Sequence, residues 1–395
     1  MVTVANDSTD PRHQVLPGMG YDGVVRISSA GSFGTGALLF DGRAVLTVAH
    51  LVRDTTEPPS VFFETSASLT PITSSQIEIH PDYDNEANND LAVLWLSEPA
   101  PIEADRYDLH RSSNEVGETF QFVGYGQSGT GDSGAMSGTP NRLLAENRFD
   151  AGMSDLKDAL GFRMAWTPER GTQLAADFDN GLIENDALGA FLSRHDVGLG
   201  ANEGLIASGD SGGPAFLEGR IVGISSYITS LGRGNVEPDV DASTNSSFGE
   251  IAAWQRISHY QQWIDQTIRD FHVNAPETPE EVQLEVTEGD SGTHYVYFLL
   301  SFEGIRAYPD QVISVDYATR DGSAMAEEDY IATVGTLNLY PGEDHVAIAV
   351  EIVGDTTREE DEIFYLDVMN PVGGSFGAGV DQLTASRTIL DDDFF

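Results

Sequence analysis

The tetrapeptide Gly-Asp-Ser-Gly occurs three times in the chain and contains Ser133, Ser211 and Ser291. A serine can act as a nucleophile in acyl transfer if a base takes its proton, a carboxylate orients the base and backbone N–H groups stabilise the oxyanion. Ser211 lies in GDSGGPAFLEGRIVGISSY, where a glycine-rich turn leads directly into an apolar strand. Ser133 lies in a run of small residues and Ser291 in an acidic turn, so neither has this rigid mount. Ser211 is therefore the predicted nucleophile.

Two further segments contain the base and the carboxylate that such a serine needs. His50 ends the apolar run AVLTVAH, which predicts an imidazole held at the edge of a sheet. Asp90 directly precedes LAVLWL, a run typical of a buried strand. On its own, each residue is explained as an ordinary strand-end side chain. The succession of His50, Asp90 and Ser211 in one strand-rich region instead predicts a nucleophilic triad.

Short strands separated by turns must position these residues. Between residues 20 and 270, apolar runs such as DGVVRIS, TFQFVGYG and PAFLEGRIVGISSY alternate with glycine-rich turns, and a helix-like stretch at 257–270 follows them. This spacing favours closed or sandwiched antiparallel sheets over alternating strand and helix units. Residues 284–391 alternate in the same way and predict a β-sandwich of about 100 residues. The chain is therefore expected to be mainly β.

The stretch 127–205 is the hardest to interpret. Its start, QSGTGDSGAMSGTPN, is rich enough in glycine and serine to form a loop. Short helices are expected within residues 150–162 and 183–195. A domain boundary is expected near 271–281, where two prolines and several acids follow the helix-like stretch. The predicted organisation is an N-terminal segment (1–14), a catalytic domain (15–272), a linker (273–283) and a sandwich domain (284–395).

Composition excludes several classes of function. The 395 residues include 64 acidic and 20 basic side chains, which gives a formal net charge of −44. Nucleic acid and anionic membrane surfaces are poor partners for such a chain, because binding either needs a basic surface. No apolar stretch approaches the roughly 18 residues that a membrane span requires. Since the chain has no cysteine, disulfides, thiolate zinc sites and cysteine nucleophiles are also excluded.

Residues 15–270 resemble the chymotrypsin-like, or trypsin, family of serine proteases. The resemblance rests on LTVAH, NDLAVLWL and GDSGGP in this order, on the tripeptide GYG and on the tail FGEIAAWQRISHYQQWIDQTI. It implies a double antiparallel β-barrel with a C-terminal helix, and an endopeptidase that acts on proteins or peptides. Ser211 would attack the scissile carbonyl, His50 would transfer the proton and Asp90 would orient the imidazole. The N–H groups of Gly209 and Ser211 would form the oxyanion hole.

The same resemblance assigns four residues to the pocket for the side chain before the scissile bond. Leu205, six positions before Ser211, stands where trypsin-like members hold an aspartate, which argues against a preference for Arg or Lys. Ser226, Tyr227 and Ile228 would lie on the pocket wall, with Ile228 where many members have glycine. A branched residue there narrows the pocket. Small or medium apolar side chains are therefore the expected preference.

The chain departs from the family at the activation site. Family zymogens commonly expose an Ile-Val terminus whose ammonium pairs with the aspartate corresponding to Asp210, and Ile-Val-Gly-Gly does not occur here. A buried and unpaired Asp210 would be costly, so either processing frees another terminus or Asp210 has a different partner. The missing disulfides must also be offset by packing or by ions.

Residues 277–395 resemble a Calx-beta domain, through TEGDSGTHYVYFLLS, VDYATRDGSAMAEEDY, GTLNLYPGEDHVAIAVEIVGD, EEDEIFYLDV and TILDDD. The resemblance implies calcium, held by acids at one end of a sandwich, and a calcium site needs about six to eight oxygen ligands. The alternative is a solvated acidic rim in a chain that is acidic throughout. The acids at the family's ligand positions are Glu288, Asp329, Asp355, Glu359, Glu362, Asp391, Asp392 and Asp393.

Together these features predict a secreted, bacterial serine endopeptidase with a calcium-binding accessory domain. The secreted location follows from the family and from the supply of calcium outside cells, since MVTVANDSTDPRHQ contains no visible signal peptide. The chain is expected to be a monomer. The alternative is a catalytically idle, protease-like protein that acts as a calcium-dependent adhesion or matrix module.

Overall fold

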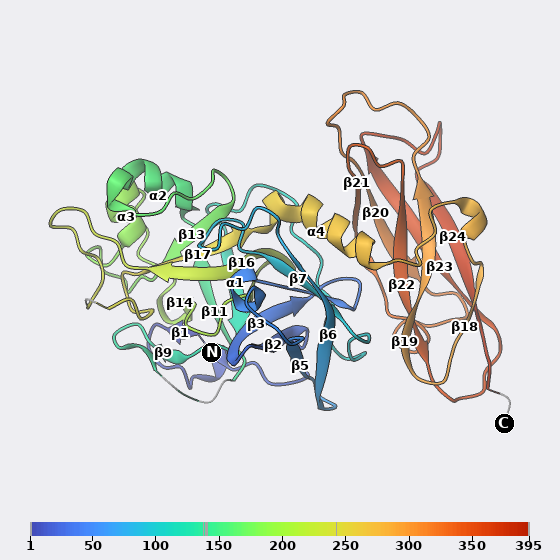
Figure 1. Cartoon of the computed structure of the whole chain (residues 1–395), viewed down its shortest axis with the longest axis horizontal. Coiled ribbons are helices and arrows are strands. Elements are labelled where there is room, and N and C mark those ends of the chain that lie inside the picture. Colours follow the sequence, from blue (N-terminus) through green and yellow to red (C-terminus); the bar gives the residue numbers. More distant parts are fainter. Residues whose placement is uncertain (1, 137, 139–140, 242, 394–395) are drawn as a thin grey trace. The chain divides into compact units, whose positions relative to one another are not determined.

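The computed structural model describes residues 2–136, 138, 141–241 and 243–393. The chain divides into two compact units, which are described separately (Figure 1). The described residues contain no helix with the length and apolar character needed to cross a membrane. Unit 1 comprises Met1–Leu39 and Arg43–Ile264, and unit 2 comprises Phe40–Gly42 and Asp265–Phe395.

A closed barrel forms the first half of unit 1, with its strands joined in the order β2-β3-β4-β7-β6-β5. All of its strand pairs are antiparallel. Apolar side chains fill the interior, where Ile27, Val45 and Leu94 have no exposed surface. The strands are β2 (Val24–Ser29), β3 (Ser32–Leu38), β4 (Ala44–Thr47), β5 (Ser60–Glu64), β6 (Leu69–Ile79) and β7 (Ala92–Leu96).

A seven-stranded antiparallel sheet forms the second half of unit 1, in the order β11-β8-β15-β16-β17-β13-β12. The expected pair of antiparallel β assemblies is therefore confirmed, and within the described ranges only the first closes by hydrogen bonds. Trp254 lies in the core of this sheet. Its ring and that of Phe120 meet edge to face, with 5.1 Å between the ring centroids. The strands are β8 (Thr119–Gly124), β11 (Leu143–Arg148), β12 (Ala151–Gly152), β13 (Gln173–Asp177), β15 (Pro214–Leu217), β16 (Arg220–Thr229) and β17 (Ile251–Arg256).

The N-terminal residues belong to unit 1, whereas the sequence suggests a separate segment up to residue 14. Strand β1 (Thr3–Val4) pairs with β14 (Gly204–Leu205) and with β9 (Ser128–Thr130), which continues to β10 (Gly134–Met136). Val2 and Val4 have no exposed surface and join the core around Trp254. Burial of these apolar side chains explains why this segment is held in the unit.

In the part of the chain that the structure describes, four α-helices accompany the sheets. The helices expected within 150–162 and 183–195 are α2 (Met153–Leu160) and α3 (Ala187–Leu192), which pack against a shared apolar cluster. The expected helix at 257–270 is α4 (Ile257–Phe271), and the division between the two units falls within it. The fourth, α1 (Ala49–Val52), follows β4. Short 3-10 turns cover Pro11–His13, Gly161–Arg163, Gly200–Asn202 and Pro279–Glu281.

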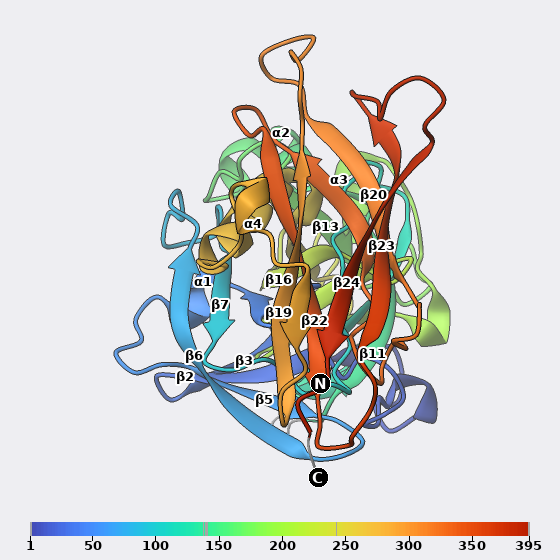
Figure 2. The ribbon, with the colours of Figure 1, turned by 90° about the vertical axis from the view of Figure 1, so that its right-hand side faces the viewer.

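Unit 2 contains a β-sandwich of a five-stranded and a two-stranded sheet, in the orders β18-β24-β23-β20-β21 and β19-β22. The expected sandwich is thereby confirmed, and its long strands run side by side along the unit (Figure 2). Phe364 is fully buried in its core, with its ring stacked on that of Tyr330. The strands are β18 (Glu285–Thr287), β19 (Gly292–Ser301), β20 (Ile313–Arg320), β21 (Val334–Leu339), β22 (His345–Gly354), β23 (Glu362–Val372) and β24 (Gln382–Leu390).

Candidate active site

Adjacent strands of the barrel bring His50 and Asp90 together. Thr47 at the end of β4 pairs with Ala92 at the start of β7. The sequence suggests that His50 ends a strand. The structure instead ends β4 at Thr47, and His50 is the second residue of α1. Asp90 lies just before β7. In an antiparallel pair the end of one strand lies beside the start of the other, so both side chains reach the same edge of the barrel.

The Asp90 carboxylate accepts three hydrogen bonds. Its Oδ1 accepts from the backbone N–H of His50 (2.9 Å), and its Oδ2 accepts from His50 Nδ1 (2.7 Å) and from Ser226 Oγ (2.6 Å). Asp90 is 1% exposed, and the His50 side chain is 33% exposed. Because a carboxylate only accepts, this contact assigns the proton to Nδ1 and leaves Nε2 of the imidazole able to take a proton.

Strand β3 places the turn that contains Ser211 next to α1. The backbone N–H of Thr35 donates to the carbonyl of Ser211 (2.9 Å). A Cβ atom on Gly34 would lie 2.6 Å from the Leu51 side chain and 2.9 Å from the same carbonyl. The Ser211 backbone and the side chain of Leu51, the residue after His50, thus both lie close to Gly34. Among the described residues no hydrogen bond joins the Ser211 hydroxyl to the imidazole, and such contacts often tighten only when substrate binds.

The two N–H groups expected in the oxyanion hole face away from the body of the turn. The carbonyl of Ser208 accepts from Gln127 N (2.8 Å), and the carbonyl of Asp210 accepts from the N–H three residues later (2.8 Å). No cis peptide occurs among the described residues, and the N–H and C=O of a trans peptide point in opposite directions. The N–H groups of Gly209 and Ser211 are therefore directed outward. Gly209 has a φ of +96°, a conformation that favours glycine.

Asp210 is held inside the turn by backbone donors. It is 1% exposed and accepts from the N–H groups of Gly126 (2.7 Å) and Ala207 (2.8 Å). A Cβ atom on Gly124 would lie 2.1 Å from Asp210 Oδ1, so the GYG tripeptide leaves the space that this carboxylate occupies. Burial raises the pKa of Asp210 to about 6. The charge of the N-terminal amine and the two backbone donors oppose this shift, so Asp210 interacts with a positive terminus as well as with backbone N–H groups.

Ser226, which the family resemblance assigns to the pocket wall, also contacts Asp90. It is 5% exposed, and its hydroxyl donates to Asp90, as described above. Gln255 Nε2 lies 3.3 Å from Ser226 Oγ and donates to it, which fixes the hydroxyl as a donor toward the carboxylate. Sequence reasoning missed this role. The signal for it was a pair of serines inside the apolar strand IVGISSYI, because a buried hydroxyl needs a hydrogen-bond partner.

The remaining pocket residues are partly corrected by the structure. Leu205 has no exposed surface and lies in the core cluster of the seven-stranded sheet, under β1, and is therefore not at an open pocket floor. Ile228 is half-buried and packs against the same cluster. The Tyr227 hydroxyl accepts from Trp166 Nε1 (3.0 Å) and donates to Gln173 Oε1 (2.7 Å). These two hydrogen bonds hold the Tyr227 side chain in place.

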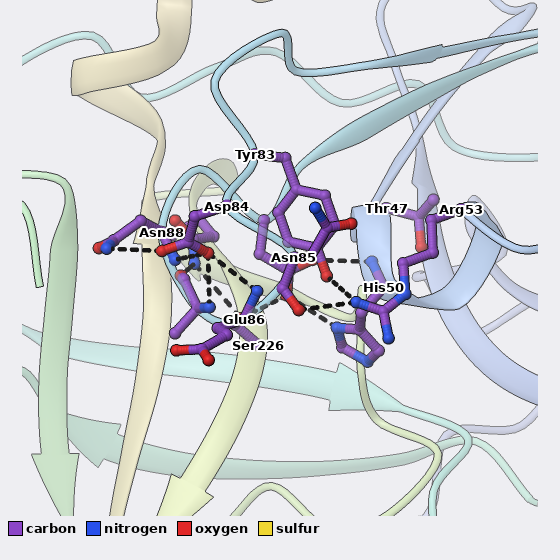
Figure 3. A network of polar contacts seen from close by, with 12 residues as sticks. Thr47, His50, Arg53, Tyr83, Asp84, Asn85, Glu86, Asn88 and Ser226 are labelled. Atoms are coloured by element: carbon purple, nitrogen blue, oxygen red, sulfur yellow. Dashed lines mark hydrogen bonds and ion pairs between the residues drawn. The ribbon is translucent and has the colours of Figure 1, made fainter. Parts of the chain in front are cut away.

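A second polar group near the imidazole comes from the loop before Asp90. Figure 3 shows the Arg53 side chain pointing toward Tyr83 and Asn85. Arg53 Nη1 donates to the Tyr83 hydroxyl (2.9 Å) and to the carbonyl of Asn85 (2.7 Å). These contacts tie the loop to the end of α1, the helix that contains His50. The sequence contained no spacing that predicts this contact.

The acids expected to bind calcium in unit 2 form two groups and two separate residues. Within the described part of the chain, carboxylate oxygens of Glu288, Asp391 and Asp393 lie within 4.8 Å of one another, and so do those of Asp329, Glu359 and Glu362. Asp392 instead accepts from the backbone N–H of Gly289 (3.0 Å), and Asp355 accepts from that of Thr357. The structure therefore brings six of the eight acids into two trios.

Electrostatic repulsion marks both trios. Burial, followed by the charges of Asp355 and Glu359, raises the pKa of Glu288 to about 7. Burial and the neighbouring Asp329 also raise the pKa values of Glu359 and Glu362. Carboxylates crowded in this way favour either a proton or a cation, and the oxygen-only donor set suits a hard ion such as Ca²⁺.

Comparison with known proteins identifies similarity in each unit. A family model described as Trypsin matches residues 14–147, which include His50 and Asp90 and end before Ser211. A solved structure titled "Neuropsin, a serine protease expressed in the limbic system of mouse brain" is 19% identical, covers 65% of this chain and 98% of its own, and has a TM-score of 0.47.

The second unit resembles a different group of proteins. A family model described as Calx-beta domain matches residues 276–393. The Drosophila melanogaster sodium/calcium exchanger Calx is 40% identical over 80 residues, and the human sodium/calcium exchanger 2 is 41% identical over 92 residues. Each match covers 20% of this chain, but only 8% and 10% of the respective exchanger. The chain thus spans about a tenth of the length of these curated relatives.

Proposed function

Because the chain joins a trypsin-like protease domain to a Calx-beta domain, we propose that it is a serine endopeptidase whose C-terminal unit binds calcium. The observation that carries the proposal is the Asp90 carboxylate, which accepts from both the backbone and Nδ1 of His50 beside the turn that contains Ser211. A nucleophile, a base and an orienting acid in this arrangement support acyl transfer from a peptide.

The proposed reaction has two acyl-transfer steps. Ser211 Oγ attacks the scissile carbonyl while His50 Nε2 takes the hydroxyl proton, and the N–H groups of Gly209 and Ser211 stabilise the oxyanion. The imidazolium then gives this proton to the departing amine, and an acyl-enzyme remains. Water, deprotonated by the same imidazole, attacks the ester carbonyl and releases the acid and the free hydroxyl. Asp90 keeps Nδ1 protonated throughout and stabilises the charged imidazole.

Small or medium apolar residues are the proposed preference before the scissile bond. Support comes from Ile228, which packs against the apolar cluster that contains Leu205 and Ile206. The family resemblance places Ile228 on the pocket wall, where a branched apolar side chain leaves room for small or medium residues and offers no charge to Arg or Lys. We also propose that the enzyme acts outside the cell, where the calcium that the two trios would bind is abundant, and that it is a monomer.

Active-site labelling tests the proposed activity. The full chain is treated with a serine-directed organophosphonate, and fluorogenic peptides with Ala, Val, Leu, Arg or Lys before the scissile bond are assayed with and without calcium. We expect one adduct per chain, on Ser211. We also expect kcat/KM to be about 10-fold or more higher for peptides with Ala or Val before the scissile bond than for the peptide with Arg, because an apolar pocket discriminates between side chains by one to three kcal/mol. A chain that forms no adduct and cleaves none of the peptides would contradict the proposal and indicate an idle adhesion protein.

Calcium in unit 2 is proposed from the two trios, because a bound cation removes their mutual repulsion. We expect EGTA in the presence of Mg²⁺ to lower the melting temperature of the unit 2 transition in the full chain by roughly 5–10 °C, the shift given by a few kcal/mol of lost binding energy. Differential scanning calorimetry measures it. A Glu288→Gln, Asp329→Asn double variant should lose this shift.

A matched control separates this effect from a general loss of charge. Glu303 is exposed and lies beyond the opposite end of β19 from Glu288. Glu303→Gln should therefore keep the full response to calcium. A unit 2 transition that is unmoved by EGTA in the unsubstituted chain would sink the proposed calcium role.

A further inference from the structure

A second group of carboxylates lies inside unit 1, apart from the candidate active site. One oxygen each of Asp177, Asp179 and Asp186 lie within 4.8 Å of one another, and these residues are 2%, 4% and 1% exposed. They come from the end of β13, from the loop after it and from the position before α3. Asp150 and Glu203 flank them and act on their pKa values. We call Asp177, Asp179 and Asp186 the inner trio.

Hydrogen bonds account for two members of the inner trio but leave an oxygen of the third unpaired. Asp177 accepts from Leu188 N (2.7 Å). Asp186 accepts from Gly189 N (2.6 Å) and from His195 Nδ1 (2.8 Å). Asp179 Oδ1 is buried, and no partner for it exists among the described residues. Buried carboxylate oxygens are normally paired, so this atom indicates that a group is missing from its surroundings.

The charge of the inner trio is poorly balanced by the protein itself. Among the described residues, His195 is the side chain in hydrogen-bond contact with the trio that can become positive, and it is 54% exposed. Burial raises the pKa values of Asp177 and Asp179, with neighbouring carboxylates adding to the shift at Asp179. Burial also raises the pKa of Glu203 to about 7. An arrangement of this kind is stable only when protons or a cation neutralise it.

We propose that Asp177, Asp179 and Asp186 bind a calcium ion in the protease unit, with Asp179 Oδ1 as the ligand that has no other partner. The donors are all oxygens, which favours a hard cation over zinc or copper. Opposite ligands of calcium are separated by about 4.6–5.2 Å, twice the usual Ca–O distance, and the oxygens of the trio fit within that span. Magnesium needs a smaller, near-octahedral shell with several waters, which buried ligands do not favour.

The site would stabilise the insertion that precedes the nucleophile turn. Asp179 N donates to Glu203 Oε1 (3.0 Å), and Glu203 is followed by β14, which leads toward Ser211. An ion held by the trio would connect β13, the loop and α3 without disulfides. His195, which donates to Asp186, would orient this ligand from outside the site. The proposal stands apart from peptidase activity, since it names none of the triad residues.

Calcium binding to the full chain tests the inner trio. The background is the Glu288→Gln, Asp329→Asn chain, in which the unit 2 sites are disabled, and calcium stoichiometry is measured by isothermal titration. We expect about one calcium ion per chain in this background. Asp179→Asn, which keeps the shape of the side chain and removes its charge, should abolish this binding. Asp132→Asn, at an exposed position in the loop after β9, should leave it unchanged.

The melting temperature, measured with and without calcium, separates calcium binding by Asp179 from a purely structural role. A structural role would give the same difference between the two chains in both conditions. Without calcium, Asp179→Asn should melt at the same temperature as the background or higher, because the variant has less repulsion. With calcium the order should reverse, since only the background gains from binding. If Asp179→Asn does not fold, Asp177→Asn serves in its place. A background chain that binds no calcium, or equal binding with and without the Asp179 charge, would overturn the proposal.

Discussion

Alanine in place of Ser211 is expected to lower kcat for peptide hydrolysis by roughly 10⁶-fold, the loss known for removal of a triad serine in other proteases. The physical reason is that the proposed mechanism uses the Ser211 hydroxyl as its nucleophile, and alanine has no atom that can form the acyl-enzyme. Only the residual stabilisation by the oxyanion hole and by substrate binding would remain. The measurement is single-turnover hydrolysis of the best fluorogenic peptide, with labelling by an organophosphonate in parallel.

The other two Gly-Asp-Ser-Gly segments provide matched controls for this substitution. Ser133 and Ser291 are both exposed, and the Ser133 hydroxyl is 2.8 Å from that of Thr130. Neither lies in a turn held against β3. Ser133→Ala and Ser291→Ala should therefore keep full activity and labelling. Labelling that disappears with Ser133→Ala but persists with Ser211→Ala would refute the assignment of the nucleophile.

Asparagine in place of Asp90 is expected to lower kcat by roughly 10⁴-fold, as in the worked example of the triad. The amide keeps the shape of the side chain, but its NH₂ group can face Nδ1 and favour the wrong imidazole tautomer. The buried negative charge that stabilises the imidazolium is lost as well. Peptide hydrolysis measured over a range of pH, together with a thermal melt, separates this loss of chemistry from a loss of folding.

A graded comparison comes from Ser226. Ser226→Ala removes one of the three hydrogen bonds to Asp90 and leaves both bonds from His50 in place. We expect kcat to fall by only about 10-fold, since one such bond contributes on the order of 1–2 kcal/mol. If Asp90→Asn lost no more activity than Ser226→Ala, the carboxylate would not be the group that orients the imidazole.

Local chain chemistry was enough to predict most of the strands. LAVLWL and GRIVGISSYI are apolar runs bounded by turn residues, and they form β7 and β16. The helix after β17 was equally visible, because apolar residues recur along it at helical spacing. The position of His50 was less accurate, because the chain begins α1 directly after β4, and a single sequence does not show where a strand of AVLTVAH ends.

Contacts between distant segments could not be obtained in this way. Ser226 and Asp90 are 136 positions apart, and the sequence alone assigned Ser226 to a pocket wall. Leu205 was assigned to a pocket floor, yet pairing with β1 places it in the core. The inner trio also escaped notice, because Asp177 and Asp179 follow a strand without any spacing typical of a metal site.

The sequence by itself determined which reactive groups the chain possesses, their order and the short strands and turns that hold each of them. These properties depend on neighbouring residues, because side-chain alternation and glycine-rich turns act over a few positions. Tertiary structure decided which groups meet: the pairing of β4 with β7 joins His50 to Asp90, and β16 adds the Ser226 hydroxyl. Such meetings depend on strand register and sheet closure, which are set by the packing of the whole unit and not by any one segment.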